Sequence, residues 1–265
     1  MSFRAYGTHF GIRVTDPHVL ERLQPHLPLG WEPAVSARVD FMYSLVAARA
    51  SQRQGTRSYH LLYAGSGRIA RTQDFDELCA RLASHLELVT AFLAKNCLFV
   101  HAGVVGWQGK AIIIPGRSFS GKTSLVTALI KNGATYYSDE FAILDSRGWV
   151  HPYPSLLSVR QGYDLNTKKY RAEELGGQVG VEPLPVGLVV ITQYQPAAPW
   201  RPLKLSPAQA MLALMNNTVA ALRGPEVSLP ILKQVVLQAK TIKSKRGEAE
   251  DVVPLLQKLV SASQR

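Results

Sequence analysis

The spacing of apolar residues over the first hundred positions predicts a small mixed region of strands and one long helix. Residues 3–14, 40–48 and 59–63 combine aromatic and β-branched side chains with partial alternation, which is typical of strands. Residues 74–95 instead repeat apolar side chains at helical spacing. We therefore expect a small N-terminal α+β region over residues 1–96, in which no motif indicates a particular chemistry.

The pattern after residue 97 predicts a larger α+β domain over residues 97–265. Its strands are short and follow one another closely, which favours a mostly antiparallel mixed sheet with flanking helices over a run of βαβ crossovers. Ser206 is a good N-cap for a later helix, and residues 161–181, which lack steady periodicity, are expected to form a surface loop or short helix near the site. The expected elements are strands at 98–105, 110–115, 135–137, 141–144, 149–151 and 186–191, and helices at 124–131 and 248–260.

Composition places the chain among globular proteins. It has 265 residues, of which 46% are hydrophobic, so it can bury a substantial core. No apolar run approaches the roughly 18 residues that a membrane span requires, and the first residues do not have the pattern of a secretory signal. We therefore expect a soluble protein of the cytoplasm, without a membrane span.

The net charge of +11 raises the alternative of a nucleic-acid-binding module. The densest basic segment, residues 240–246, alternates charged and uncharged residues as one solvated face of a strand would, and no aromatic pair beside it could stack on bases. This pattern argues against nucleic acid as the partner. A positive surface also suits an anionic nucleotide or an acidic partner, and composition does not separate these.

The most specific motif is a phosphate loop of the form G-x-x-x-x-G-K-[ST], which follows the apolar segment of residues 111–114 and precedes a predicted helix. Its glycines let backbone N–H groups surround a phosphate, its lysine reaches the β and γ phosphates, and its hydroxyl can hold Mg²⁺. The residues expected to contact the nucleotide are Gly116, Arg117, Ser118, Phe119, Ser120, Gly121, Lys122, Thr123 and Ser124.

Two further features lie near this loop in the expected fold. Asp139 and Glu140 follow a predicted strand about seventeen residues beyond Lys122, where one acid could position metal and the other could take a proton from a hydroxyl. His101 ends the strand before the phosphate loop, which would bring its imidazole toward the same end of the sheet. An exposed acidic turn and a structural histidine are the alternative interpretations.

In this order, His101-Ala102-Gly103, the phosphate loop, residues 129–133 and Ser138-Asp139-Glu140 resemble the catalytic domain of the HPr serine kinase/phosphorylase family, which is related to phosphoenolpyruvate carboxykinases. The resemblance implies an HPr kinase-like core of largely antiparallel β structure with helices. It also implies ATP and Mg²⁺ as cofactors and an ATP-dependent kinase that phosphorylates a hydroxyl, with serine favoured, on a peptide, protein or small molecule. Small members of this group resemble tailoring kinases that act on ribosomally made peptides.

The same resemblance implies roles for individual residues. Lys122 would contact the nucleotide phosphates, Thr123 would bind Mg²⁺, and Asp139 would accept the proton of the substrate hydroxyl. Glu140 would assist the metal or the lysine, and His101 would lie beside the transferred phosphate. Residues 151–160 are similar to a stretch in smaller relatives in which a basic residue follows strands near the site, which makes Arg160 a candidate substrate or phosphate contact.

The sequence departs from the family in four respects. Its second acid is Glu140 rather than Asp, its loop carries the bulky Arg117 and Phe119, the family's C-terminal segment associated with phosphorolysis is not found, and residues 1–96 do not resemble the usual regulatory domain. The resemblance therefore does not extend to the reverse reaction or to HPr as the substrate. A phosphate-loop NTPase or nucleotide-binding switch without a hydroxyl acceptor is the main alternative, and a homo-oligomer is compatible with the sequence.

Overall fold

The computed structural model describes residues 1–36, 38–48, 57–116, 120–160, 167–221 and 224–261. The chain forms two compact units, Met1–Asn96 and Cys97–Arg265. Both combine helices with mixed sheets, which confirms the expected α+β class at that level. None of the helices in the described residues is both long enough and apolar enough to cross a membrane.

The N-terminal unit is a mixed sheet with helices packed against it. Its described strands lie in the order β3-β1-β2-β4-β5-β6, and all neighbours are antiparallel except β2 and β4. Asp74 begins the long helix by accepting hydrogen bonds from the backbone N–H groups of Asp76 and Glu77, as an N-cap does. The elements are β1 (Ser2–Ala5), β2 (Thr8–Val14), α1 (Val19–Leu23), the 3-10 helix η1 (Gln24–His26), β3 (Glu32–Pro33), β4 (Phe41–Val46), β5 (His60–Ala64), β6 (Gly67–Thr72) and α2 (Phe75–Leu93).

The C-terminal unit is built on a second, larger mixed sheet. Its described strands run in the order β11-β10-β7-β8-β14-β16-β15, β9 pairs with β7, and β11 also pairs with β14. The elements are β7 (Leu98–Trp107), β8 (Lys110–Pro115), α3 (Lys122–Lys131), β9 (Thr135–Ser138), β10 (Phe141–Leu144), β11 (Trp149–His151), β12 (Leu157–Arg160), β13 (Thr167–Tyr170), η2 (Glu173–Leu175), β14 (Leu184–Tyr194), β15 (Leu203–Lys204), α4 (Pro207–Met215), α5 (Pro225–Gln238), β16 (Lys240–Arg246) and α6 (Ala249–Ser261).

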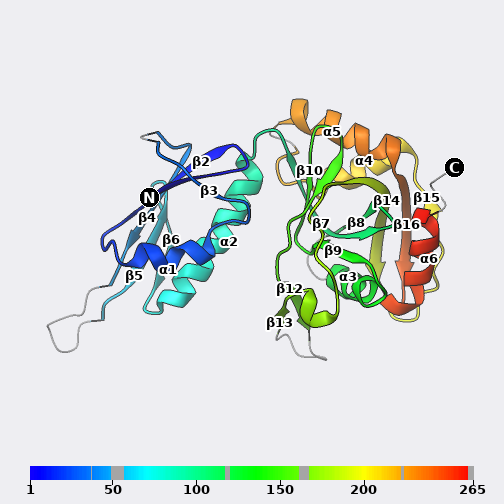
Figure 1. Cartoon of the computed structure of the whole chain (residues 1–265), viewed down its shortest axis with the longest axis horizontal. Coiled ribbons are helices and arrows are strands. Elements are labelled where there is room, and N and C mark those ends of the chain that lie inside the picture. Colours follow the sequence, from blue (N-terminus) through cyan, green and yellow to red (C-terminus); the bar gives the residue numbers. More distant parts are fainter. Residues whose placement is uncertain (37, 49–56, 117–119, 161–166, 222–223, 262–265) are drawn as a thin grey trace. The chain divides into compact units, whose positions relative to one another are not determined.

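Helices cover both faces of this sheet (Figure 1). The apolar sides of α3 and α6 pack with alternate residues of β8 and β14, whereas α4 and α5 pack on the opposite face with the intervening residues. Strand β14 is parallel to both β8 and β16, and the other pairings of the described strands in this sheet are antiparallel. The carboxyl ends of β8, β14 and β16 therefore meet at one edge, which is where α/β sheets commonly bind ligands.

Several expected elements need correction. Helix α3 begins at Lys122, two residues earlier than expected. Within residues 161–181, η2 is a short helix, as one of the two expectations had it, but the strand β13, which pairs with β12, was not expected. Strand β16 is also not simply a solvated face: Lys243 and Lys245 are exposed, but Arg246 is 1% exposed because its side chain lies on the buried side of the same alternation.

Candidate functional site

The phosphate-loop sequence connects the end of β8 to the start of α3. Gly121 is the N-cap of α3 and has a φ of 87°, a left-handed conformation that glycine adopts without strain. A Cβ atom on Gly121 would lie 2.6 Å from Nη2 of Arg246, and a Cβ on Gly116 would lie 2.6 Å from Oγ of Ser120. A side chain at either position would displace these groups, and at Gly121 it would also be strained by the left-handed backbone. Arg117, Ser118 and Phe119 lie outside the described residues.

Lys122 lies in the first turn of α3 and is 7% exposed. Its Nζ donates a hydrogen bond of 2.6 Å to the backbone oxygen of Gly116. Burial lowers the pKa of Lys122, whereas the nearby carboxylates of Asp139 and Glu140 act to raise it. The amine is therefore already directed toward the beginning of the loop, where a phosphate group would replace the backbone oxygen as its partner.

Asp139 follows β9, and its carboxylate is only 6% exposed. Its Oδ2 accepts a hydrogen bond of 2.7 Å from the hydroxyl of Thr123, the neighbour of the loop lysine. Its Oδ1 is buried and has no hydrogen-bond partner among the described residues. Burial raises the pKa of Asp139 to about 6, and the Thr123 hydroxyl and the Lys122 amine limit that rise.

His101 and Glu140 lie beside this centre. Strand β7 pairs His101 with Phe141 of β10, and Nε2 of His101 lies 3.7 Å from Oε1 of Glu140. Burial and the charge of Lys122 lower the pKa of His101 to about 4, so the imidazole is neutral near pH 7 and its contact with Glu140 is not an ion pair. Its Nδ1 is buried without a hydrogen-bond partner in the described structure. The structure thus brings His101, Lys122, Thr123, Asp139 and Glu140 together.

These residues fit a nucleotide with its magnesium ion. Ser120 Oγ and Asp139 Oδ1 are buried polar atoms without partners among the described residues, and both lie at the loop or at its neighbouring strand. Within the described residues there is no group of three or more His, Cys, Asp or Glu side chains that could hold a metal. Mg²⁺ needs no such group, because it takes one or two protein ligands together with phosphate oxygens and water.

A cavity of about 750 Å³ adjoins the phosphate loop at Gly116 and Ser120. Gly116 and Ser120 form part of its wall, and most of the remainder comes from the carboxyl ends of β14 and β16 and from the approach to β15. Arg201, Lys243 and Lys245 line it, and no Asp or Glu is among its described lining residues. The cavity therefore favours an anionic ligand. Apart from Gly116 and Ser120, its lining residues were not predicted from the sequence as part of the site.

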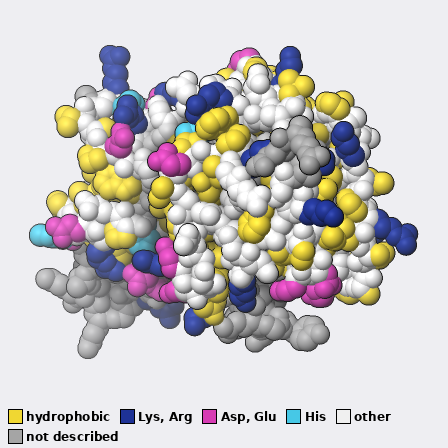
Figure 2. Space-filling view, turned by 45° about the vertical axis from the view of Figure 1, so that its right-hand side comes forward, with side chains coloured by type: hydrophobic (Ala, Val, Ile, Leu, Met, Phe, Trp, Pro, Cys, Tyr) yellow, Lys and Arg dark blue, Asp and Glu magenta, His cyan; other side chains and the backbone are white. Residues whose placement is uncertain are grey.

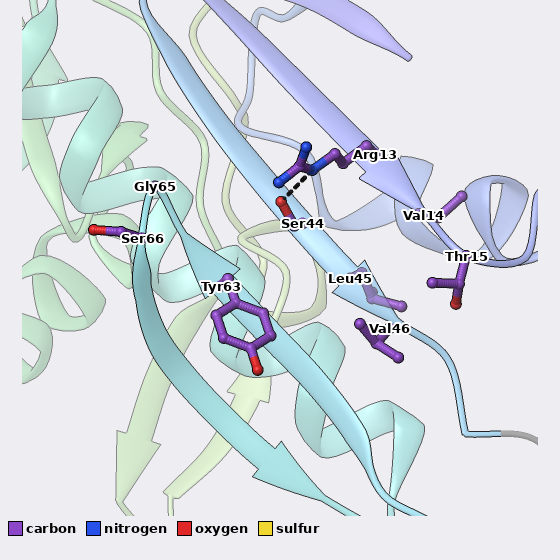
Figure 3. A pocket seen from close by; sticks show the side chains of 9 residues that line it. All are labelled: Arg13, Val14, Thr15, Ser44, Leu45, Val46, Tyr63, Gly65 and Ser66. Carbon is purple, nitrogen blue, oxygen red and sulfur yellow. Dashed lines mark hydrogen bonds between the residues drawn. The ribbon is translucent and has the colours of Figure 1, made fainter.

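Other candidates lie elsewhere. Arg160 ends β12, and its side chain lies outside what the structure describes. A second cavity, of about 440 Å³, lies in the N-terminal unit, where side chains of β2, β4 and β5 surround it (Figure 3). There Nε of Arg13 donates to Oγ of Ser44 over 2.7 Å. Among its described lining residues there is no carboxylate, imidazole or thiol.

Comparisons with known proteins add little to this geometry. No family model and no curated protein matches the chain. Among solved structures, the Hpr(Ser) kinase/phosphatase from Coxiella burnetii is similar at 15% sequence identity and a TM-score of 0.31, over 62% of this chain and 94% of that chain. A likeness of this size supports no transfer of residue roles, so the site rests on this chain's own residues.

Proposed function

We propose that this protein is an ATP-dependent kinase that transfers the γ-phosphate to a hydroxyl of a peptide, protein or small molecule, with serine as the favoured acceptor. One observation carries the proposal: the hydroxyl of Thr123 in the phosphate-loop motif lies 2.7 Å from the carboxylate of Asp139. A group suited to bind the donor and a group suited to take a proton are therefore adjacent, as hydroxyl phosphorylation requires.

Each residue has a distinct task in this proposal. The backbone N–H groups at the start of α3 and the Lys122 amine bind the phosphates, and Asp139 accepts the proton of the acceptor hydroxyl. The acceptor oxygen forms a bond to the γ-phosphorus while the bond from that phosphorus to the bridging oxygen breaks, which leaves ADP and the phosphorylated acceptor. Magnesium, when bound with ATP, would offset phosphate charge, held by Thr123 with assistance from Glu140.

The proposal assigns the two sides of β8 to the two substrates. Asp139, His101 and Glu140 belong to β7, β9 and β10 or their ends, whereas the cationic cavity is lined mostly by residues of β14 and β16. Because the acceptor hydroxyl must reach Asp139, the nucleoside part of ATP would extend into the cavity beside Gly116 and Ser120. The C-terminal unit would then be the catalytic domain.

Phosphate transfer from γ-labelled ATP tests the proposal directly. With a serine-containing acceptor present, wild-type protein should label the acceptor, and Asp139→Asn should lower the rate about 10²- to 10⁴-fold while sparing ATP binding, because it removes only the proton acceptor. Asp251→Asn, a substitution of an exposed carboxylate in α6, is the matched control and should retain the wild-type rate. Label that appears only as free phosphate with every acceptor would instead indicate an NTPase or a nucleotide switch.

A further inference from the structure

Arg246 is a buried cation placed directly behind the phosphate loop. It ends β16, is 1% exposed, and is the largest fully buried side chain in the described residues. Its Nη2 donates a hydrogen bond of 2.7 Å to the backbone oxygen of Gly121, and its Nη1 donates one of 2.8 Å to that of Gly247. Its Nε is buried without a hydrogen-bond partner, and none of the ion pairs between described residues involves it.

These contacts determine which way the loop's peptide groups point. The Gly121 oxygen accepts from Arg246 and from the backbone N–H of Leu125, and the Ser120 oxygen accepts from the backbone N–H of Tyr194 at 3.3 Å. In a trans peptide the C=O and the N–H of the next residue point in opposite directions. Because both oxygens are held toward the helix and the strand ends, the N–H groups of Gly121 and Lys122 are directed the other way, as an anion-binding loop requires.

No carboxylate of the described residues forms an ion pair with Arg246, whose Cζ lies 5.6 Å from the centre of the Tyr194 ring. A buried guanidinium without a bonded carboxylate is costly, because desolvation is not offset by an ion pair. Burial lowers the pKa of Arg246, and the more distant Glu248 and Glu250 only partly oppose this shift. The guanidinium therefore depends on the backbone oxygens of Gly121 and Gly247 for its hydrogen bonds.

We infer that Arg246 is a positioning residue for the phosphate loop: through the Gly121 oxygen it fixes the Gly121–Lys122 peptide in the orientation in which the Lys122 N–H can bind phosphate. The inference rests on the nucleotide-binding half of the proposed function and not on transfer to a hydroxyl. It therefore applies equally to ATP and to a polyphosphate without a nucleoside.

Calorimetric titration with Mg-ATP and with magnesium tripolyphosphate tests this role. Arg246→Met should weaken the binding of both ligands by about 10- to 100-fold, the equivalent of one or two charge-assisted hydrogen bonds. Arg246→Lys, which keeps the charge but loses the fork that reaches Gly121 and Gly247, should give an intermediate loss. Lys258→Met removes an exposed charge from α6 in the same unit and should bind both ligands as the wild type does.

A second measurement separates positioning from simple destabilisation. Without ligand, Arg246→Met should melt close to the wild-type temperature, because removal of an unpaired buried charge offsets the lost hydrogen bonds, while hydrogen exchange at the amides of Lys122 and Thr123 should become faster. If Arg246→Met does not fold, Arg246→Lys decides the question alone by its affinity. Wild-type affinity in the folded variants would overturn the inference.

The two proposals fail in different ways. If the wild-type protein binds neither Mg-ATP nor tripolyphosphate, both the proposed function and the role of Arg246 are wrong. If it binds both ligands, with the expected loss in the Arg246 variants, but transfers phosphate to no acceptor, only the kinase proposal is wrong.

Discussion

Gly103 shows how a residue without a side chain shapes the candidate site. A Cβ atom there would lie 2.5 Å from Cγ2 of Val126 in α3 and 3.7 Å from Oδ1 of Asp139. Gly103→Ala should therefore destabilise the C-terminal unit by about 1–3 kcal/mol through overpacking, and displace α3 from β7. Denaturant unfolding measures the loss of stability, and Mg-ATP titration measures the effect on the loop.

Gly224→Ala is the matched control for this substitution. A Cβ atom on Gly224, the N-cap of α5, would meet nothing closer than Oε1 of Glu226 at 3.6 Å. We expect a loss below about 1 kcal/mol there, because alanine is a poorer N-cap than glycine but meets no close contact. Equal losses in the two variants would show that the contact with Val126 does not limit the space at Gly103.

At the scale of single residues, the sequence identified the groups that belong to a continuous motif and missed those that reach it from a distance. Lys122 and Thr123 are recognisable because the loop, strand and helix are contiguous. Arg246 is 125 residues away from Gly121, whose oxygen it binds. The alternation of residues 240–246 does indicate that Arg246 is buried, because it places Arg246 on the same face of the strand as the buried Ile242 and Ser244. The local sequence does not indicate which loop this face contacts.

At the scale of elements, Asp145 holds the turn between β10 and β11 and should make its stability depend on pH. Its carboxylate accepts hydrogen bonds from the backbone N–H groups of Arg147 and Trp149, from the guanidinium of Arg147 and from the ring of His151. Burial acts to raise the pKa of Asp145, but these donors outweigh it and hold the pKa below its ordinary value.

Asp145→Asn should therefore destabilise the C-terminal unit by about 1–2 kcal/mol at pH 7, since it weakens charge-assisted hydrogen bonds. A carboxylate whose pKa is lower in the folded state than in the unfolded state stabilises the folded protein. This contribution is fully present at a pH above the unfolded-state pKa of about 4, and it is lost as the pH falls through the folded-state pKa. Urea unfolding of the wild type and of Asp145→Asn between pH 3 and pH 7 measures the difference in their free energies of unfolding. This difference should become smaller below about pH 4. Glu182→Gln, at an exposed carboxylate of the same unit, should show no such trend.

The elements that the sequence predicted well are those with a strong period or a clear boundary. Helix α2 and the β7–β8 hairpin were predicted from apolar spacing and a glycine-containing turn. The short strands β12, β13 and β15 were missed because two to four residues with many charged side chains carry too little pattern. The position of β14 between β8 and β16 could not be predicted, because pairing depends on contacts between segments far apart in the chain.

At the scale of the whole molecule, the groups of the candidate site all belong to the unit Cys97–Arg265. That unit has its own buried apolar clusters on both faces of its sheet, and the unit Met1–Asn96 has a separate one. The sequence indicated a boundary near residue 96 from the change in pattern alone. It gave no function for the first unit.

The net charge of +11 leads to a last prediction, which separates a nucleotide site from a nucleic-acid surface. Figure 2 shows Lys and Arg side chains scattered over the visible face rather than joined in one continuous band. We expect duplex DNA to bind weakly, because the densest basic segment, residues 240–246, alternates with uncharged residues, and to lose affinity steeply with salt, because counterion release is the source of such binding. Mg-ATP should instead bind with a shallower salt dependence, because it carries far fewer charges than duplex DNA and its binding releases fewer counterions.

Lys122→Ala provides the decisive comparison. It should weaken Mg-ATP binding by at least about 10-fold, since it removes a charge-assisted contact to phosphate, and leave any DNA binding unchanged. Lys131→Ala removes an exposed charge at the other end of α3. It should change the affinities for Mg-ATP and for DNA by no more than a small factor. Binding of both ligands is measured by fluorescence anisotropy from 50 to 300 mM salt. The nucleic-acid module would be favoured if the protein bound DNA tightly at physiological salt, kept that affinity in Lys122→Ala, and did not bind Mg-ATP. In that case the basic surface would bind DNA without a contribution from the phosphate loop.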